Sequence, residues 1–412
     1  MSRTNEEIQR PKLSFGLILV SNVIWIFGLF LYVNFIGLFM RDVLGANSVQ
    51  VGFWSTVFSL SMMLFVGLGG TLTAKLGAKQ TLFLGWIGII PAPIIYMFAP
   101  TWQIVLIGAF FEGLSGLAGA PIGPYISALS RGSRRGQAFT ILAASTAIGG
   151  IPSPVLGGII IQLFGYQFLF FIVAILFVVS SLIIIPISNL RQDKTDGVQK
   201  RSWAFFKNRI FIFSTLLWFT MNTLVFITQI FVPLFLSDRF GLIEAQIGAL
   251  GSITNACGAV LGPILGWLGD RWSLTGSLTL PIVGTLGFYG LLIVIPNATF
   301  LPLVFGFRGL VYGLNSLTIA ILSHYIPKVQ LADSLSAHYL IGRTLTPITP
   351  IIGGIAFAYN ASLPLVVSTA LMPIALVFLM LLHRASAKAV RIEREEVEEV
   401  PGIVREELHP PV

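Results

Sequence analysis

Three charged side chains lie deep inside long apolar segments of this 412-residue chain: Glu112, Arg308 and Arg343. A charge at the centre of a lipid bilayer costs about 2.5–3.5 kcal/mol, so a charge retained there usually serves a proton, an ion or a ligand. A carboxyl group can carry a proton, and a guanidinium can bind an anionic group. The alternative is a static ion pair that only joins helices, and we favour the functional interpretation for Glu112 and Arg308.

Arg343 and His338 share one apolar segment, and each allows two interpretations. Arg343 either binds a substrate directly or pairs with a backbone carbonyl or with Glu112. His338 is a candidate proton site because imidazole titrates near neutral pH. Polar packing explains His338 better, so only Arg343 is kept as a candidate substrate ligand.

Polar side chains recur on one face of the segment around Arg308. Arg308, Tyr312 and Asn315 follow the spacing i, i+4, i+7, which places them on one side of a helix. Faces on two other segments carry further candidates: Trp218, Asn222 and Gln229 on one, and Trp25 and Tyr32 on the other. A buried amide in lipid needs a partner, which a cavity, a substrate or a neighbouring helix supplies. For single residues we favour the interhelical bond, and for the face beside Arg308 we favour a cavity.

The segments that position these residues are membrane-spanning helices. The chain is 55% hydrophobic and 10% charged, whereas a soluble domain is about 25% charged. Apolar runs of about 20 residues follow one another, and in lipid such runs must be helical to satisfy their backbone. We expect the first run to be retained as a span. The twelve expected spans are 14–40, 48–71, 79–98, 101–129, 137–163, 167–188, 209–236, 245–268, 275–296, 299–325, 333–357 and 361–383.

The chain repeats itself at an offset of 196 residues. Residues 35–52 and 231–248 share seven identities in eighteen positions without a gap. The same offset relates Glu112 to Arg308, so the two charges hold equivalent positions. Two copies of one multi-helix unit are typical of transporters. The expected fold is an all-α membrane protein of twelve transmembrane helices in two pseudo-symmetric six-helix bundles. The expected parts are an N-terminal bundle (1–190), a cytoplasmic linker (191–207), a C-terminal bundle (208–384) and an acidic cytoplasmic tail (385–412).

The distribution of charge gives the expected orientation. The formal net charge is +8, but nearly all Lys and Arg residues fall on one side of the alternating topology, and the other side carries only Arg41 and Arg239. This positive-inside bias puts both termini and the central linker in the cytoplasm. It also argues against nucleic-acid binding. We expect a multi-pass protein of the cytoplasmic membrane that is a monomer.

Motifs for other chemistry are missing from the sequence. There is no GxxxxGK[ST] phosphate loop, no HExxH, no GxSxG and no Cys/His cluster, and Cys257 is the only cysteine. ATP-driven transport and an embedded enzyme are therefore not expected. No metal and no cofactor are expected either.

Two short motifs occur in both copies. A loop after the eighth span reads Gly266-Trp267-Leu268-Gly269-Asp270-Arg271, and its copy runs from Gly70 to Lys75. A Pro-x-x-Gly-Gly motif opens at Pro154 and again at Pro350; its glycines are Gly157 and Gly158, and Gly353 and Gly354. These resemble the cytoplasmic loop signature Gly-x-Leu-x-Asp-Arg-x-Gly-Arg and the fifth-span motif Gly-Pro-x-x-Gly-Gly of the major facilitator superfamily. Ala74 replaces the acid of the first loop, and Ser153 replaces the first glycine of the fifth-span motif.

The resemblance implies a transporter in which two bundles rock around a central cavity lined by spans 1, 4, 7 and 10. Glu112 and Arg308 would then face each other, with Glu112 as the proton carrier and Arg308 binding an anionic group. The aromatic contacts would be Trp25, Tyr32, Trp218 and Tyr312. The loop motifs would form a cytoplasmic gate: Gly70, Lys75, Gly266, Asp270 and Arg271. Its glycines would let neighbouring helices approach, and its latch would rest on Asp270 and Arg271.

The substrate class follows less directly. The fifth-span motif is associated with antiporters in the family, which favours proton-coupled export of drug-like or metabolite compounds. Proton-coupled uptake or facilitated diffusion of an organic acid or sugar is the alternative. A ligand sensor that signals through the acidic tail is an alternative of another class. The expected partners are a small-molecule substrate, protons and the lipid bilayer.

Overall fold

The computed structural model describes residues 5–129, 135–188 and 203–398. Most of the expected linker 191–207 and the last part of the expected tail 385–412 lie outside the described residues. Within them the regular structure is entirely helical, with no strand. This confirms the expected all-α fold class.

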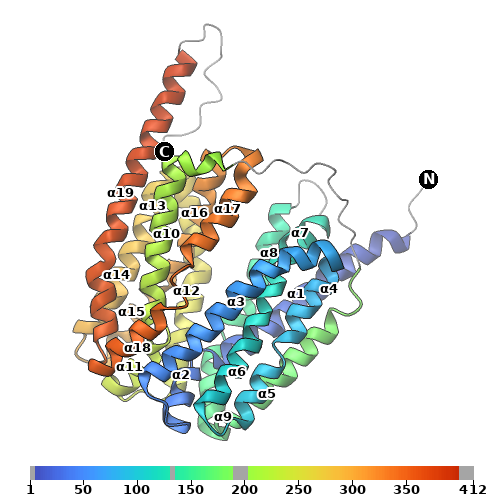
Figure 1. The fold of residues 1–412 in the computed structure, drawn as a ribbon, viewed down its shortest axis with the longest axis vertical. Helices are drawn as coiled ribbons and strands as arrows, with labels where there is room; N and C mark the ends of the chain where they lie inside the picture. Colours follow the sequence, from blue (N-terminus) through green and yellow to red (C-terminus); the bar gives the residue numbers. More distant parts are fainter. Residues whose placement is uncertain (1–4, 130–134, 189–202, 399–412) are drawn as a thin grey trace. The chain divides into compact units, whose positions relative to one another are not determined.

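The helices of the first copy are α1 (Asn5–Tyr32), α2 (Ile36–Leu38), η1 (Phe39–Val43), α3 (Ser48–Leu76), α4 (Ala78–Gly88), α5 (Pro91–Phe98), α6 (Trp102–Gly113), η2 (Leu114–Ala118), α7 (Gly119–Leu129), α8 (Arg135–Gly150) and α9 (Ser153–Ile183). Those of the second copy are η4 (Ala204–Lys207), α10 (Arg209–Thr228), α11 (Phe231–Phe240), α12 (Glu244–Arg271), α13 (Leu274–Ser277), α14 (Thr279–Val294), η5 (Ala298–Phe300), α15 (Leu301–Arg308), η6 (Gly309–Val311), α16 (Tyr312–Tyr325), α17 (Lys328–Gly342), α18 (Thr349–Tyr359) and α19 (Leu363–Glu398). Figure 1 shows the helices in sequence colours.

Ten helical segments of the described chain are long and apolar enough to cross a membrane. One of them, Gln137–Ile183, covers two expected spans, which meet at Gly165, where φ is +82°. The expected span 333–357 is not one helix. It is divided into α17 and α18, with turns at residues 343–348 between them.

Helix interruptions recur at the 196-residue offset. Turns follow α1 at residues 33–35 and α10 at residues 229–230. The turn at 151–152 corresponds to the last two residues of the longer turn at 343–348. Three of these breaks are followed within a few residues by a proline: Pro154, Pro233 and Pro350. Pro154 and Pro233 lie four and five residues after the last residue of the preceding helix, whereas Pro350 lies eight residues after it. A proline ring clashes with the carbonyl of residue i−4 and lacks an N–H, so it ends the helix there. The sequence did not locate these breaks within the expected spans.

The chain divides into two compact units. Unit 1 comprises Met1–Gly197, Ile230–Asn255 and Pro350–Ala361, and unit 2 comprises Val198–Gln229, Ala256–Thr349 and Ser362–Val412. This division differs from the boundaries 1–190 and 208–384, because two segments of the second copy contact the first. Within unit 1, α1 packs against α8 and α9; within unit 2, α19 packs against α10 and α14.

Candidate functional site

Glu112 lies near the end of α6 in the interior of unit 1, with no exposed surface. Its Oε2 atom accepts a hydrogen bond of 2.9 Å from the Tyr96 hydroxyl. The same hydroxyl accepts a bond of 3.0 Å from the indole N–H of Trp54. Helices α3, α5 and α6 thus join in a directional chain of donors that ends on the carboxyl group.

The other carboxyl oxygen, Oε1, is buried and has no hydrogen-bond partner among the described residues. Tyr32 is fully buried beside it, with its ring centroid 6.0 Å from that of Tyr96, and its hydroxyl interacts electrostatically with Glu112. No cation forms an ion pair with Glu112 in the described part of the chain. Among the described residues the carboxyl is therefore held by one neutral donor, the Tyr96 hydroxyl.

Sequence reasoning found Glu112 and Tyr32 but missed Tyr96 and Trp54. Buried Tyr and Trp side chains usually direct their polar atom to a hydrogen-bond partner. A Tyr or Trp inside an apolar span, such as Tyr96 or Trp54, is therefore a candidate partner for a buried carboxyl group. The packing of α5 against α6 helps to fix Tyr96: a side chain at Gly108 would overlap its ring.

A second cluster lies within unit 2, between α10, α16 and α17. The Thr215 hydroxyl is 3.0 Å from Nδ1 of His338. Trp218 stacks on His338 with ring centroids 5.7 Å apart, and Gly342 leaves no room for a side chain against the indole. Tyr339 meets Trp218 edge-on and donates a 2.8 Å bond to Oδ1 of Asn315.

Three nitrogen atoms in this region are buried without a hydrogen-bond partner among the described residues: Nε1 of Trp218, Nε2 of His338 and Nε of Arg343. Arg343 lies directly after the end of α17, where the expected eleventh span is broken, and interacts electrostatically with Tyr339. Unpaired buried polar groups are costly, so sites that retain them often receive a ligand. These groups can hold an acceptor such as a carbonyl or a carboxylate.

The other expected substrate contacts lie elsewhere. In unit 2 the Arg308 guanidinium lies 5.3 Å from the centroid of the Phe288 ring and 5.9 Å from that of Phe305. The Asn222 amide donates to the Trp218 carbonyl of its own helix at 2.8 Å. Gln229 is exposed at the break after α10, and Tyr312 packs over Gly258.

Trp25 belongs to unit 1, where its ring lies 5.8 Å from Trp86 and 6.0 Å from Phe177. Glu112 and Arg308 fall in different units: Glu112 accepts its bond from Tyr96 of unit 1, and Arg308 lies over two rings of unit 2. That the two face each other stays a prediction.

The first glycine of each loop motif, Gly70 or Gly266, does not lie at a close helix contact. A side chain at Gly70 or Gly266 would meet nothing within 4 Å, so the expected close helix approach is absent there. It occurs one residue away from the first of them, at Gly69, where a Cβ would lie 3.0 Å from the Leu117 carbonyl oxygen. Arg271 lies 5.4 Å from the Trp267 ring centroid. Neither Asp270 nor Lys75 makes an ion pair among the described residues.

The Pro-x-x-Gly-Gly motifs mark two equivalent helix crossings inside unit 1. A Cβ at Gly248 of α12 would lie 2.7 Å from the carbonyl carbon of Pro154, and one at Gly52 of α3 would lie 3.0 Å from that of Pro350. A Cβ at Gly158 would clash in the same way with the backbone of Glu244, and one at Gly354 would clash with the backbone of Ser48. Gly157 packs against the backbone of Leu31, and Gly353 is buried. The 196-residue offset relates the two crossings, because it relates Gly52 to Gly248 and Pro154 to Pro350.

Arg41 joins two equivalent aspartates of unit 1. Its guanidinium bonds Asp42 at 2.6 Å and Asp238 at 2.7 Å, and these two residues are 196 positions apart. Both bonds are partly exposed, with 23% of the Arg41 side chain accessible. The sequence singled out Arg41 by its side of the membrane but not by these partners.

We expect Arg41→Gln to lower the free energy of unfolding by about 0.5–2 kcal/mol, because two partly exposed ion pairs are each worth about 0.2–1 kcal/mol. Thermal melting in a double-mutant cycle with Asp238→Asn measures the coupling, which 1 M salt should largely remove. Arg239→Gln is the matched control for the loss of one charge, since Arg239 lies over the Phe235 and Phe240 rings. A cycle with zero coupling at low salt contradicts the bridge.

The comparison with known proteins agrees with these features. A family model described as Major Facilitator Superfamily matches residues 18–342. The chain belongs to this superfamily. An uncharacterized transporter of Buchnera aphidicola is 28% identical over 199 residues, which are 46% of this chain and 50% of that protein. The class B tetracycline resistance protein of Escherichia coli is 23% identical over 346 residues, 79% of this chain and 83% of that protein.

Among solved structures, the nucleoside transporter NupG has the same fold. It aligns with a TM-score of 0.73 and 15% identity, and the alignment covers 90% of this chain and 99% of that one. The family match and the ten apolar helices identify the chain as a multi-pass membrane transporter of the major facilitator type.

Proposed function

We propose that this transporter exports small organic solutes in exchange for protons, and that Glu112 carries the proton. The observation that supports the proposal most is the chemistry around Glu112: a fully buried carboxyl held by the Tyr96 hydroxyl, without a cation partner among the described residues. The similarity to a tetracycline resistance protein over most of both chains favours export over uptake.

An ionised Glu112 in this surrounding is an unpaired buried charge, which costs several kcal/mol. Binding a proton removes that charge, and releasing the proton requires water or a cation to reach the carboxyl. If the transport cycle alternately buries and exposes Glu112, the buried conformation favours the protonated carboxyl and the exposed conformation allows proton release. Proton transfer is then coupled to the conformational change. Tyr96 and Trp54 position the carboxyl by fixing one of its two oxygens.

The substrate in this proposal binds at the Trp218 cluster of unit 2, defined by Trp218, His338, Tyr339 and Arg343. The ring faces of Trp218 and Tyr339 suit an aromatic or apolar body. The buried donors suit a carbonyl or an anionic group of the same compound. A planar compound with one such group fits this inventory better than a sugar, which needs many paired hydroxyl partners.

Proton movement in proteoliposomes tests the function. Full-length protein is reconstituted with a trapped pH-sensitive dye, and pools of drug-like compounds and metabolites are added outside. Exchange predicts that a substrate drives protons in the opposite direction to its own movement. Protein-free liposomes are the control. Protons that move in the same direction as the substrate indicate coupled uptake, and substrate movement without protons indicates facilitated diffusion; either result rejects the proposal.

A further inference from the structure

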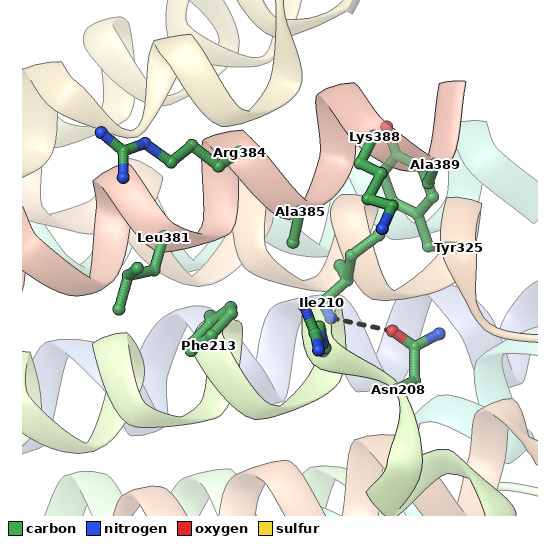
Figure 2. Close-up of a pocket in the computed structure, with 10 residues that line it drawn as sticks. Asn208, Ile210, Phe213, Tyr325, Leu381, Arg384, Ala385, Lys388 and Ala389 are labelled. Carbon is green, nitrogen blue, oxygen red and sulfur yellow. Dashed lines mark hydrogen bonds between the residues drawn. The ribbon is translucent and has the colours of Figure 1, made fainter. Parts of the chain in front are cut away.

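A basic pocket lies within unit 2 where the start of α10 meets residues 381–389 of α19. Its volume is about 470 Å³, and its lining includes Arg209, Arg384 and Lys388. Phe213 and Leu381 give it an apolar wall. Figure 2 shows Leu381, Arg384 and Lys388 spaced along α19, with Phe213 on the facing helix.

The helix register explains why these side chains share a pocket. Leu381, Arg384 and Lys388 recur at i, i+3 and i+7 of α19, which is one face of that helix. Arg209 is the first residue of α10, and the side chain of Asn208 accepts the Ile210 N–H at 2.8 Å. The positive end of a 20-residue helix therefore adds to the three cations.

The pocket has no negative counterpart of its own. No acidic residue lines it, and none of its three cations makes an ion pair among the described residues. The three cations are exposed, whereas Ile210 beneath them is buried. The pocket therefore combines a basic rim with an apolar wall.

Its level in the membrane follows from its neighbours. The charge distribution puts Arg209 and Arg384 at the cytoplasmic surface. Trp203 is 60% exposed and Phe206 is 40% exposed, and both stand just before Asn208 in the sequence. Exposed aromatic rings beside basic residues are typical of the headgroup region of a bilayer.

We propose that this pocket binds the headgroup of an anionic phospholipid of the cytoplasmic leaflet. The phosphate is bound by Arg209, Arg384 and Lys388, and the first part of an acyl chain lies along Phe213 and Leu381. A guanidinium group can donate two parallel hydrogen bonds to the oxygens of one phosphate. Basic pockets between transmembrane helices bind anionic lipid headgroups. A free phosphate would leave the apolar wall without a partner.

Native mass spectrometry of delipidated full-length protein tests the proposal. The protein is titrated with phosphatidylglycerol, phosphatidylcholine or glycerol phosphate, and bound molecules are counted. We expect phosphatidylglycerol to bind at least 10-fold more tightly than the other two. Arg384→Gln with Lys388→Gln should weaken it about 10- to 30-fold, because each surface cation contributes about 1 kcal/mol. The charge-preserving pair Arg384→Lys with Lys388→Arg should largely restore binding.

Lys79→Gln with Lys328→Gln removes the same charge from cytoplasmic positions outside the pocket and should change binding less than 2-fold. The proposal is overturned by equal binding of phosphatidylglycerol and phosphatidylcholine, or by equal effects of the two charge-removing pairs. Glycerol phosphate bound as tightly as the lipid marks a phosphate site instead. Lipid binding only after deletion of residues 399–412 identifies the acidic tail as the occupant.

Discussion

Gly248→Ala is expected to destabilise the protein by about 1–3 kcal/mol, although alanine usually stabilises a helix relative to glycine by about 0.5–1 kcal/mol. The reason is the crossing with Pro154, where the new Cβ would lie 2.7 Å from a backbone carbonyl carbon. Backbone atoms cannot rotate away as a flexible side chain can. The measurement is the melting temperature of purified protein, with the substrate transport rate as a second readout.

Gly262→Ala is the matched control, because Gly262 lies on the same helix, α12, and a Cβ there meets nothing within 4 Å. It should melt at or above the wild-type temperature. Gly52→Ala, at the equivalent crossing with Pro350, should behave like Gly248→Ala. Similar melting of the Gly248 and Gly262 variants would show that the crossing is looser than its geometry indicates.

Trp218→Ala is expected to raise the substrate KM about 10- to 100-fold. The change removes the ring that stacks on His338 at 5.7 Å and contacts Tyr339, and it leaves a cavity where a substrate ring would lie. A large aromatic truncation in a packed site costs about 3–5 kcal/mol, part of which affects folding rather than binding. Concentration-dependent transport in proteoliposomes separates KM from the maximal rate.

Trp218→Phe separates the contact made by the ring from the hydrogen bond donated by the indole N–H, since it keeps a ring and removes the unpaired N–H. An intermediate KM is expected, about 3- to 10-fold above wild type, because one buried hydrogen bond to the substrate is worth about 0.5–1.5 kcal/mol. Trp272→Ala is the control, because Trp272 is 69% exposed at the end of α12. An unchanged KM in Trp218→Ala would move the substrate site away from this cluster.

The sequence anticipated much of the fold because its signals are global. Hydropathy defined the spans, and the 196-residue offset linked Gly52 to Gly248 and Pro154 to Pro350. It did not show that Gly52 packs on Pro350 and Gly248 on Pro154, since a repeat gives equivalence and not contact. The helix breaks near Pro154, Pro233 and Pro350 were not located from the sequence, because hydropathy defines an apolar run and does not show where its helix is interrupted.

The candidate site was anticipated only in part. Charge in an apolar segment identified Glu112, but its bond to Tyr96 depends on how α5 and α6 are rotated against each other. The i, i+7 spacing predicts that Trp25 and Tyr32 share one helix face, yet periodicity does not say where that face points. In the structure it points into the interior of unit 1, toward Trp86 and Tyr96.

The role of Glu112 in coupling is the central claim, and Glu112→Gln tests it most directly. Glutamine keeps the size and a hydrogen-bonding oxygen for Tyr96 but cannot exchange a proton. With a substrate in hand, wild type and Glu112→Gln are compared in proteoliposomes for accumulation driven by a pH gradient and for exchange of labelled against unlabelled substrate. Asp333→Asn serves as the control for loss of a carboxyl group elsewhere. We predict that Glu112→Gln loses gradient-driven accumulation at least 100-fold and retains exchange, whereas accumulation at the wild-type level would contradict the account.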